Sequence, residues 1–416
     1  MAKKESTGLV KEGWISNFNL VGIAKRNDFT FKINQKSDKS DWIYNSLNLS
    51  IDCGEHCGVV YCELMNGYGS ERDNVVYLPS KKEDGSADFK NSYTIAWEDR
   101  FNEDILKDVP DMMFIKVGLE KTDQEKTFVQ KFLTGYDAIA YIEKYLEDGM
   151  VVNVKGQLKY TVYNGVVQCR KEVNSIFLSK ATPDQYKAVF TQTVLLDQDS
   201  CTKKSLDKDK SVLMVEAYVL EKFKEYNGYD LTDNGKIKGG QLVPLRRTFE
   251  YPVDLTTDKG KEKVTKVLNS DKMFKVKKGT VTQITFEGEF VESGATVQVT
   301  MDDVPDDIKE LIDIGVYTEE EALARCADNN TNERKMIILK PHTKKVGDDD
   351  NKITIIDLTT EKFVEEDLLL DCLVAKEEDE EEETPPFEED EVEETEEETE
   401  TEEESTDDDS DWLNAL

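Results

Sequence analysis

Histidine is nearly missing from this chain of 416 residues, which holds only His56 and His342. Two histidines leave little room for a multi-histidine metal site or for histidine-based catalysis. Long apolar runs are missing too. No stretch of 18 apolar residues occurs, so we expect no membrane-spanning helix. The start, Met1–Ser6, has two lysines with no apolar core after them, which predicts that there is no secretion signal.

Cysteine is sparse, and its seven copies make an odd number. Without an export signal, this count favours free thiols in a reducing cytoplasm. Short catalytic motifs are also missing, because the chain has neither a Gly-x-x-x-x-Gly-Lys-Ser/Thr loop nor a Gly-x-Ser-x-Gly elbow. We therefore expect no enzyme and no cofactor, although catalytic groups that meet only in space leave no such trace.

Positive charge is scarce, and the deficit is concentrated at one end. The chain carries 53 Lys and Arg against 89 Asp and Glu, a net charge of -36. Residues 375–416 hold 24 acids and one base, so -23 lies there and -13 lies in residues 1–374. Such a tail cannot bury enough apolar area to offset the entropy of ordering, so we expect it to be disordered. The rest is long enough to bury a sizeable core.

The first segment is expected to be mainly strands, with a glycine inside its first strand, at Gly22. Interior glycines of this kind often mark a bulge or a barrel bend. A helix is expected with Ile139, Ile142 and Leu146 on one face. Asn164-Gly165 between two alternating runs predicts a hairpin. The expected strands are 14–24, 45–52, 58–64, 114–119, 151–160 and 166–178, with a helix over 136–146 and a loop over 81–91.

The second segment is expected to be built in the same way. Its strands are predicted over 212–220, 242–255, 281–299 (a hairpin about Ser293-Gly294), 335–340 and 353–358, and its helices over 259–268, 305–315 and 318–327. A loop is expected over 226–240, where Gly, Asn and Asp are frequent.

A weak internal repeat links the two segments. Val152-x-Val154-x-Gly156-x-Leu158 matches Ile284-x-Phe286-x-Gly288-x-Phe290. A short helix, a strand with an interior glycine and then a hairpin is the pattern of the second half of an OB barrel. The fold class we predict is mainly β, with two OB-like barrels and short helices, over residues 1–180 and 188–374, followed by the tail. The alternative is two unrelated β-rich domains that share a hairpin.

Basic and aromatic residues alternate along several of these strands. Cations neutralise phosphates and aromatic faces stack on bases, so such strands favour single-stranded nucleic acid. Residues 1–50 hold eight bases and five acids within an acidic protein. The candidate contact residues are Lys25, Arg26, Phe29, Phe31, Lys32, Trp42, Tyr44, Lys159, Tyr160, Tyr163, Arg170, Lys171, Arg246, Arg247, Phe249 and Tyr251. For any single strand aromatic the alternative is a place in the core. The polar neighbours of Trp42 favour exposure.

The chain ends in an apolar tip on an acidic run. The candidate partner-binding residues are Asp407, Asp408, Asp409, Asp411, Trp412, Leu413 and Leu416. Buried aromatic and leucine anchors give such contacts their affinity, whereas a tail that only adds solubility needs none.

Two further clusters have structural alternatives. Cys53, His56, Cys57 and Cys62 could bind zinc, but their spacing differs from paired Cys-x-x-Cys, and the cysteines could pack as small apolar residues. The acids at 302–307 could attract a cation, but capping of the helix expected at Pro305 is favoured. We expect no metal. The acids at 348–350 are expected at a solvated hairpin tip.

Two barrel-like units followed by a long acidic tail with an apolar tip resemble single-stranded DNA-binding replication proteins, and the bacteriophage versions most. Trp14–Ala24 with Gly22, Val151–Tyr160 and Asp407–Leu416 carry the resemblance. The bacterial tip, unlike this one, ends in an acidic-Pro-Phe signature. The resemblance implies that the chain coats single-stranded DNA in replication, recombination and repair, and recruits replication or recombination proteins through its tail. It would act in the cytoplasm, that of a bacterial host if a phage encodes it.

An acidic interaction protein is the alternative function. It would be a chaperone for basic proteins or a nucleic-acid mimic, with the acidic run as its active element. A third alternative, a β-rich phage structural protein, leaves the tail without a role. No residue pattern in the chain distinguishes DNA from RNA.

Overall fold

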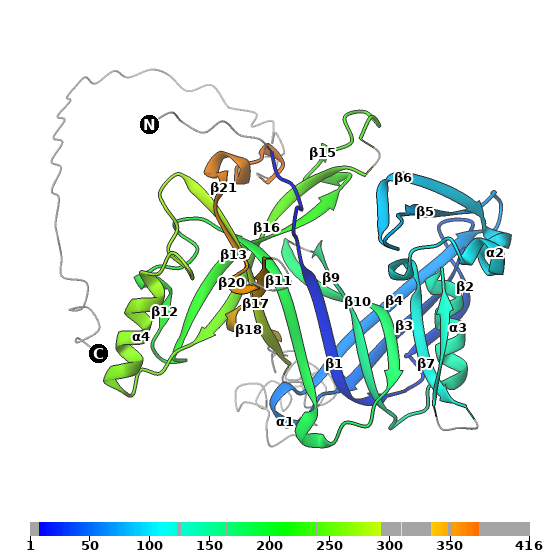
Figure 1. Ribbon diagram of the computed structural model, residues 1–416, viewed down its shortest axis with the longest axis horizontal. Helices are drawn as coiled ribbons and strands as arrows, with labels where there is room; N and C mark the ends of the chain where they lie inside the picture. Colours follow the sequence, from blue (N-terminus) through cyan, green and yellow to red (C-terminus); the bar gives the residue numbers. More distant parts are fainter. Residues whose placement is uncertain are drawn as a thin grey trace.

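The computed structural model describes residues 8–122, 126–163, 165–237, 239–292, 309, 334–347 and 352–373. Its architecture is mainly β, with few helices. The chain forms two five-stranded barrels that lie beside one another, the first in blue to green and the second in green to orange (Figure 1).

The first barrel closes through five strand pairs. Its strands are β1 (Ser16–Lys25), β3 (Trp42–Asp52), β4 (Val59–Gly69), β9 (Val151–Tyr163) and β10 (Val166–Leu178). Strand β1 pairs with β3 and β9, β3 pairs with β4, and β9 pairs with β10, all antiparallel. Strand β10 closes the ring by pairing parallel with β4. Helix α3 (Gly135–Tyr145) lies between β4 and β9 in the chain. This strand order and helix position are those of an OB barrel.

The second barrel repeats this connectivity. Its strands are β11 (Lys187–Leu196), β13 (Val212–Phe223), β16 (Gln241–Pro252), β17 (Thr280–Glu292) and β18 (Arg334–Pro341). Strand β11 pairs with β13 and β17, β13 pairs with β16, and β17 pairs with β18, all antiparallel. The pair β16–β18 is parallel, and helix α4 (Asp258–Leu268) lies between β16 and β17. The prediction of two OB-like barrels is confirmed.

Strand β1 joins the barrels because it changes partner along its length. Residues 16–21 pair with β11 of the second barrel, and residues 23–25 pair with β3 of the first. The change falls at Gly22, where a Cβ would lie 2.1 Å from the backbone oxygen of Asp52. Glycine is therefore required at position 22, because the backbone of β3 approaches too closely for a side chain. Figure 1 shows β1 and β11 side by side at the centre of the molecule.

The internal repeat occupies equivalent places in the two barrels. Gly156 on β9 is opposite Phe18 on β1, and Gly288 on β17 is opposite Phe190 on β11. Phe18 and Phe190 are themselves opposite each other across the β1–β11 pair. A Cβ on Gly156 would lie 2.7 Å from the Phe18 ring, and one on Gly288 would lie 2.3 Å from the Phe190 ring. Each glycine therefore makes room for the facing phenylalanine.

Each barrel helix begins at a threonine that caps it. The Thr134 side chain accepts a hydrogen bond from the Asp137 backbone N–H, and Thr257 accepts one from Gly260. Helix α3 buries the apolar face formed by Ala138, Ile139 and Ile142. The predicted helices over 136–146 and 259–268 are confirmed.

The remaining elements decorate the barrels. An insertion between β4 and α3 has its own small core of Leu78, Ile95, Val109 and Phe114. The strands among these elements are β2 (Phe31–Lys36), β5 (Val75–Lys81), β6 (Ala87–Ala96), β7 (Ile115–Lys121), β8 (Thr127–Phe132), β12 (Leu206–Asp207), β14 (Glu225–Tyr226), β15 (Tyr229–Asp230), β19 (Thr343–Val346), β20 (Ile353–Ile356) and β21 (Leu358–Val364). The short helices among them are α1 (Gly54–Cys57) and α2 (Glu103–Leu106).

Two local predictions need correction. The loop expected over 81–91 contains the start of strand β6, because the β5–β6 hairpin is a separate two-stranded sheet whose polar residues face solvent. The loop expected over 226–240 contains the small pair β14–β15. The helices expected over 305–315 and 318–327, the turn at Ser293-Gly294 and the acids at 302–307 and 348–350 lie outside the described residues, except Lys309.

Candidate nucleic-acid interface

The outer face of the first barrel presents side chains from β2, β3, β4, β10 and β9. Along β3, Leu47, Leu49 and Ile51 are buried, so the alternate residues Trp42 and Tyr44 lie on the opposite, outer face. The rings of Trp42 and Tyr44 stack with centroids 4.8 Å apart and planes 19° apart. Oligonucleotide-binding OB folds use this part of the barrel, the face of their second and third strands.

One of two glycines on β4 makes room for this stack. Gly67 is opposite Tyr44, and Gly69 is opposite Trp42. A Cβ on Gly67 would lie 2.7 Å from Nε1 of Trp42. The missing side chain of Gly67 therefore lets the Trp42 ring lie against the strand.

Two further side chains of β4 widen the apolar part of this face. Val60, Cys62 and Leu64 point into the core, and Tyr61 and Met65, at alternate positions of the strand, point outward. Tyr61 is 52% exposed and Met65 is 50% exposed. An exposed tyrosine face and a thioether are suited to contact a flat, polarisable base.

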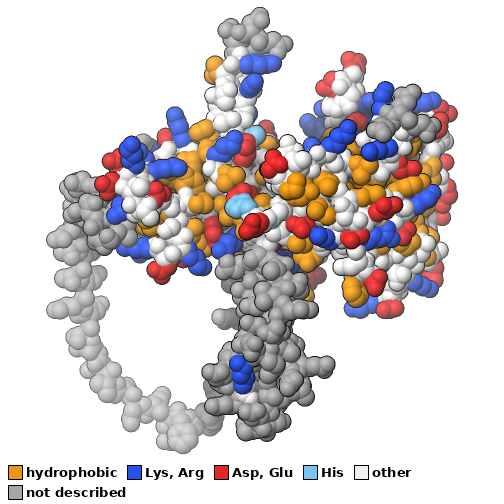
Figure 2. All heavy atoms as spheres, turned by 90° about the horizontal axis from the view of Figure 1, so that it is seen from below, with side chains coloured by type: hydrophobic (Ala, Val, Ile, Leu, Met, Phe, Trp, Pro, Cys, Tyr) orange, Lys and Arg blue, Asp and Glu red, His pale blue; other side chains and the backbone are white. Residues whose placement is uncertain are grey.

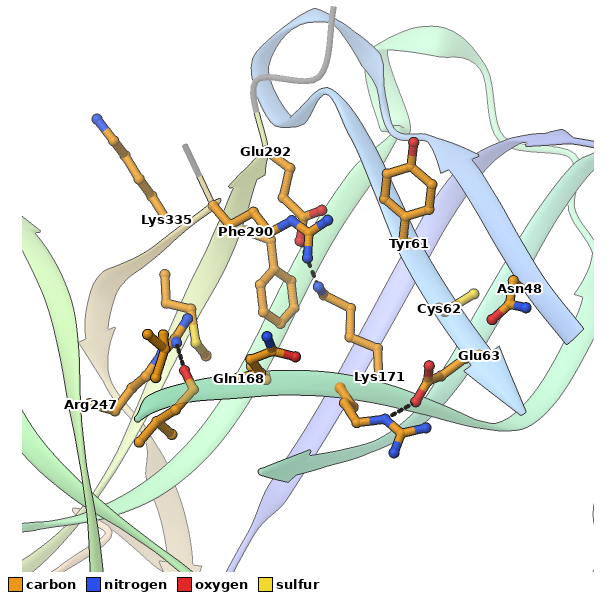
Figure 3. Close-up of a pocket in the computed structure, with 16 residues that line it drawn as sticks. Asn48, Tyr61, Cys62, Glu63, Gln168, Lys171, Arg247, Phe290, Glu292 and Lys335 are labelled. Carbon is orange, nitrogen blue, oxygen red and sulfur yellow. Dashed lines mark hydrogen bonds and ion pairs between the residues drawn. The ribbon is translucent and has the colours of Figure 1, made fainter. Parts of the chain in front are cut away.

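A groove runs from this face across to the second barrel. It consists of three hollows of about 390, 450 and 320 Å³ that share lining residues. Arg170 and Glu63 belong to the first and third hollows, and Arg247 and Arg334 belong to the first and second. The central hollow is drawn in Figure 3, where Tyr61 projects from β4 and Phe290 from β17 on either side of Lys171. We call this continuous surface the groove.

The groove is basic although the protein is acidic. Its acidic side chains are Glu63, Glu172, Glu250 and Glu292. Its basic side chains are Lys159, Arg170, Lys171, Arg246, Arg247, Arg334 and Lys335. Seven bases against four acids leave an excess of three positive charges. A local field of this kind attracts phosphates whatever the net charge of the whole protein.

This positive charge is local. On the face that Figure 2 shows, Lys and Arg side chains are interspersed with Asp and Glu over the described surface. Mixed charges of this kind do not build a field that extends over the face. On this face, electrostatic attraction for a polyanion therefore has to come from a confined surface.

Hydrogen bonds and ion pairs fix several of these bases. Arg170 pairs with Glu63, and Lys171 pairs with Glu292 at 2.6 Å. Arg247 donates from Nη1 to the backbone oxygen of Val167 at 2.7 Å, while its Nε is buried with no hydrogen-bond partner among the described residues. The contact with Val167 holds the β9–β10 hairpin of the first barrel against the second.

At the far end of the groove, hydroxyl and carboxylate groups fix two more bases. Arg246 donates from Nη2 to the hydroxyl of Tyr218 at 2.7 Å. Lys335 lies 3.8 Å from the carboxylate of Glu250.

Six of the sixteen candidate contact residues line the groove. These are Trp42, Lys159, Arg170, Lys171, Arg246 and Arg247. Tyr44 lies at the edge of the groove, where its ring stacks on that of Trp42. Tyr163 is 65% exposed at the tip of the β9–β10 hairpin.

Three aromatic predictions are wrong, because the side chains lie in the core. Phe249 is 1% exposed, Tyr160 is 2% exposed and Tyr251 is 7% exposed. The Tyr160 hydroxyl meets Oε1 of Gln192 at 3.1 Å, and burial raises the pKa of Tyr160. Phe249 packs against Phe190. Faces that are covered on both sides cannot stack on a base.

The candidates near the start of the chain lie at the connection between β1 and β3. The guanidinium of Arg26 donates to the backbone oxygens of Glu143 and Leu146 at the end of α3 and lies 4.9 Å from the Phe31 ring. Those bonds satisfy helix-end carbonyls, so Arg26 has a structural role.

The other three of these residues differ in what they contact. Lys25 pairs with Asp52 at 3.4 Å, and Phe29 is 79% exposed. Lys32 on β2 is opposite Ser46 of β3. This places Lys32 beside the outer face, at a distance from the three hollows.

The groove residues that sequence reasoning missed include Tyr61, Met65, Phe290, Arg334 and Lys335. The alternation of β4 carried the signal for Tyr61 and Met65, since their neighbours are apolar. Arg334 and Phe290 had no such signal, because only the closing of the second barrel against the hairpin brings them to the first. The Arg334 guanidinium lies 5.8 Å from the Tyr61 ring.

The cysteine cluster does not converge on one point. Cys53, Cys57 and Cys62 are buried in the core, whereas His56 is exposed and its Nε2 lies 2.7 Å from Glu289. Burial raises the pKa of the Cys62 thiol to about 12, which disfavours the thiolate that a metal needs. Among the residues that the structure describes, no three His, Cys, Asp or Glu are grouped to hold a metal ion.

The tail tip and the helices complete the description of the site residues and elements. The tail tip, Asp407–Leu416, lies outside the described residues. Within the described part of the chain, none of the helices is long and apolar enough to cross a membrane.

Comparison with known proteins gives little. No protein-family model matches the chain. No curated protein matches it either. A solved structure, a deletion mutant of the single-stranded DNA-binding protein from Thermus aquaticus, is similar at 9% identity and a TM-score of 0.27, over 67% of this chain and 88% of that one. A TM-score this low supports no conclusion about fold or function.

Proposed function

We propose that this chain is a non-enzymatic protein that binds single-stranded DNA along the groove. The observation that carries the proposal is a continuous basic groove with the exposed ring of Tyr61 and the half-buried ring of Trp42, on the outer face of an OB-like barrel. Stacked rings and cationic side chains are the two elements that sequence-tolerant single-strand binding requires.

Each part of the groove has a separate task. The basic side chains of Arg170, Arg246 and Lys159 neutralise backbone phosphates, which gives affinity without sequence preference. Trp42 and Tyr61 take up unpaired bases, because a ring can only stack on a base whose face is open. Duplex DNA hides its base faces, so the groove favours single strands.

The chain would protect strands during replication, recombination and repair. We propose that the acidic tail recruits replication or recombination proteins, with Trp412 and Leu413 as apolar anchors. The tail tip is the ground for this part, together with the likeness in chain organisation to phage proteins of this class. Its place of action would be the cytoplasm.

The test is a titration of intrinsic tryptophan fluorescence with oligo-dT at low and high salt. We expect quenching and an affinity that falls as the salt concentration rises. In a plot of the logarithm of the binding constant against the logarithm of the salt concentration, each neutralised phosphate should contribute about −0.7 to the slope. The variant K159Q/R170Q should weaken binding and flatten this slope. The variant K261Q/K266Q is the control, because both lysines lie on α4, outside the groove.

Absence of quenching in the wild type at low salt, confirmed with a labelled oligonucleotide, would contradict the proposal. In that case the acidic interaction protein becomes the better supported function. Equal losses in K159Q/R170Q and K261Q/K266Q would show that general charge, and not the groove, attracts DNA.

A further inference from the structure

The floor of the groove holds a buried ion pair. Lys171 of β10 and Glu292 at the end of β17 lie 2.6 Å apart, and each side chain is only 6% exposed. Figure 3 shows them reaching toward each other from the two barrels, in the central hollow. A role for this pair in binding depends on the proposed function, because it requires that a strand occupies the groove.

The surroundings satisfy the pair only in part. The Lys171 ammonium lies 4.5 Å from the Phe290 ring, and among the described residues its hydrogen bond goes to Glu292. An ammonium has three donors, so the pair leaves donor capacity unused. Removing two charges from water costs several kcal/mol per ion, on the order of what their attraction returns. Such a pair adds little to stability, and its presence in a binding groove calls for another role.

The position of the pair suggests that role. Five basic side chains line the central hollow, and they face two carboxylates, those of Glu63 and Glu292. A strand that passes from Trp42 to Arg246 has to cross this hollow, which joins the other two. Lys171 is thus a deeply buried cation on the path that the phosphates would take. In the free protein its ammonium group is paired with the carboxylate of Glu292.

We propose that Glu292 is an internal stand-in for a backbone phosphate. Its carboxylate accepts from Lys171 in the free protein, as a phosphate oxygen does in the complex. When a strand binds, one phosphate replaces the carboxylate on Lys171, and Glu292 turns to solvent and takes up a cation. The exchange keeps Lys171 paired in both states and lowers the affinity for DNA.

The test is a double-mutant cycle on Lys171 and Glu292, with oligo-dT binding followed by fluorescence. We expect E292Q to bind several-fold more tightly than wild type. Its salt slope should be steeper, because no freed carboxylate has to take up a cation. In the K171Q background the same change should give no gain. E289Q, on the same strand but outside the groove, is the matched control for loss of one negative charge.

Several results would overturn the inference. Unchanged or weaker binding by E292Q, when wild type binds, would show that the pair is purely structural. A gain of equal size in the K171Q background, or in E289Q, would show a general charge effect. Urea unfolding identifies a variant that fails to fold. In that event E292D, which keeps the charge but withdraws it by one methylene, should still show a smaller gain, and no gain there sinks the idea.

Two further arms separate the causes of failure. Oligo-U of the same length should show the same gain as oligo-dT, because the exchange involves phosphate and not sugar. A gain confined to one of the two would contradict a phosphate stand-in. If wild type and all variants fail to bind either strand, the proposed function fails, and the phosphate exchange that depends on it is overturned as well.

Discussion

Exposure separates the aromatic side chains of this protein into two groups with different consequences. Trp42 and Tyr61 belong to outward positions of β3 and β4, beside basic side chains of the groove. Tyr61 is exposed, and Trp42 is half-buried with one face against Tyr44. Phe249 and Tyr160 belong to inward positions, and their faces are covered. A substitution in the first group should therefore affect binding, and one in the second should affect folding.

The variants W42A and Y61A should each weaken oligo-dT binding by about 1–3 kcal/mol, the range for loss of one base stack. Fluorescence anisotropy of a labelled oligonucleotide measures this without relying on the removed tryptophan. Y77A is the control, since Tyr77 is 74% exposed on the β5–β6 hairpin and lies outside the groove. A similar loss in Y77A would show that exposure alone, and not position, governs contact.

The variant F249A should lower the free energy of unfolding by about 3–5 kcal/mol, because it leaves a cavity beside Phe190. Urea denaturation monitored by circular dichroism gives the value. The oligo-dT affinity of the folded fraction should stay within a factor of about two, because Phe249 does not line the groove. A twofold change corresponds to about 0.4 kcal/mol of binding free energy. A specific loss of affinity with unchanged stability would restore Phe249 as a contact residue.

Among the elements, the glycine-bearing strands β9 and β17 define the barrels. Strand β9 pairs with β1 and strand β17 pairs with β11, and in each pair a phenylalanine ring lies over the glycine. The neighbouring strand is close as well, because a Cβ on Gly156 would lie 1.9 Å from the backbone oxygen of Glu172, and one on Gly288 would lie 2.2 Å from that of Ile337. Backbone cannot move aside as a flexible side chain can, so these glycines hold the curvature.

The variants G156A and G288A should each destabilise the fold by at least about 1–3 kcal/mol, the usual cost of overpacking, and by more if the strand cannot shift. G239A is the matched control, because the atom nearest its Cβ would be the end of Lys222, at 3.8 Å. Thermal unfolding of the three variants checks the order. If G156A were as stable as G239A, the strand crossing would not be tight.

At the scale of the whole molecule, the two barrels are joined through a shared sheet and core. The chain carries a positive groove on these barrels and a strongly negative segment at residues 375–416. The barrels share a sheet through β1–β11 and a continuous core that includes Leu20, Phe190 and Phe249. The groove spans both barrels, so its length depends on their fixed relation. The -23 charge of residues 375–416 lies on the same chain, and we expect it to compete with DNA for the positive groove.

A chain ending at Val374 should therefore bind oligo-dT more tightly than the full chain at low salt. The difference should shrink toward high salt, where the Debye length falls to about 3 Å at 1 M. A chain ending at Asp411 keeps all 24 acids and loses only the apolar tip, so it should bind DNA like the full chain. Equal affinity of the Val374 and full-length chains at low salt would rule out competition.

The sequence by itself determined the kinds of elements and their order. Alternation in β3 and β4, Gly22, Gly156 and the Asn164-Gly165 turn predicted strands, bends and a hairpin, because these are local consequences of side-chain period and backbone freedom. Together with two helices in equivalent places they were enough for two OB-like barrels. The composition of residues 375–416 likewise set the separation of charge.

Only the tertiary structure decided which faces are covered and which residues meet. Alternation divides a strand into two faces but does not say which one packs, so Tyr160 and Phe249 were placed outside when they lie inside. The groove unites Arg170, Arg247 and Arg334 from three strands because β1 pairs with β11 and the β9–β10 hairpin reaches the second barrel. Contacts between residues distant in the chain depend on how whole sheets close, and no local pattern records that.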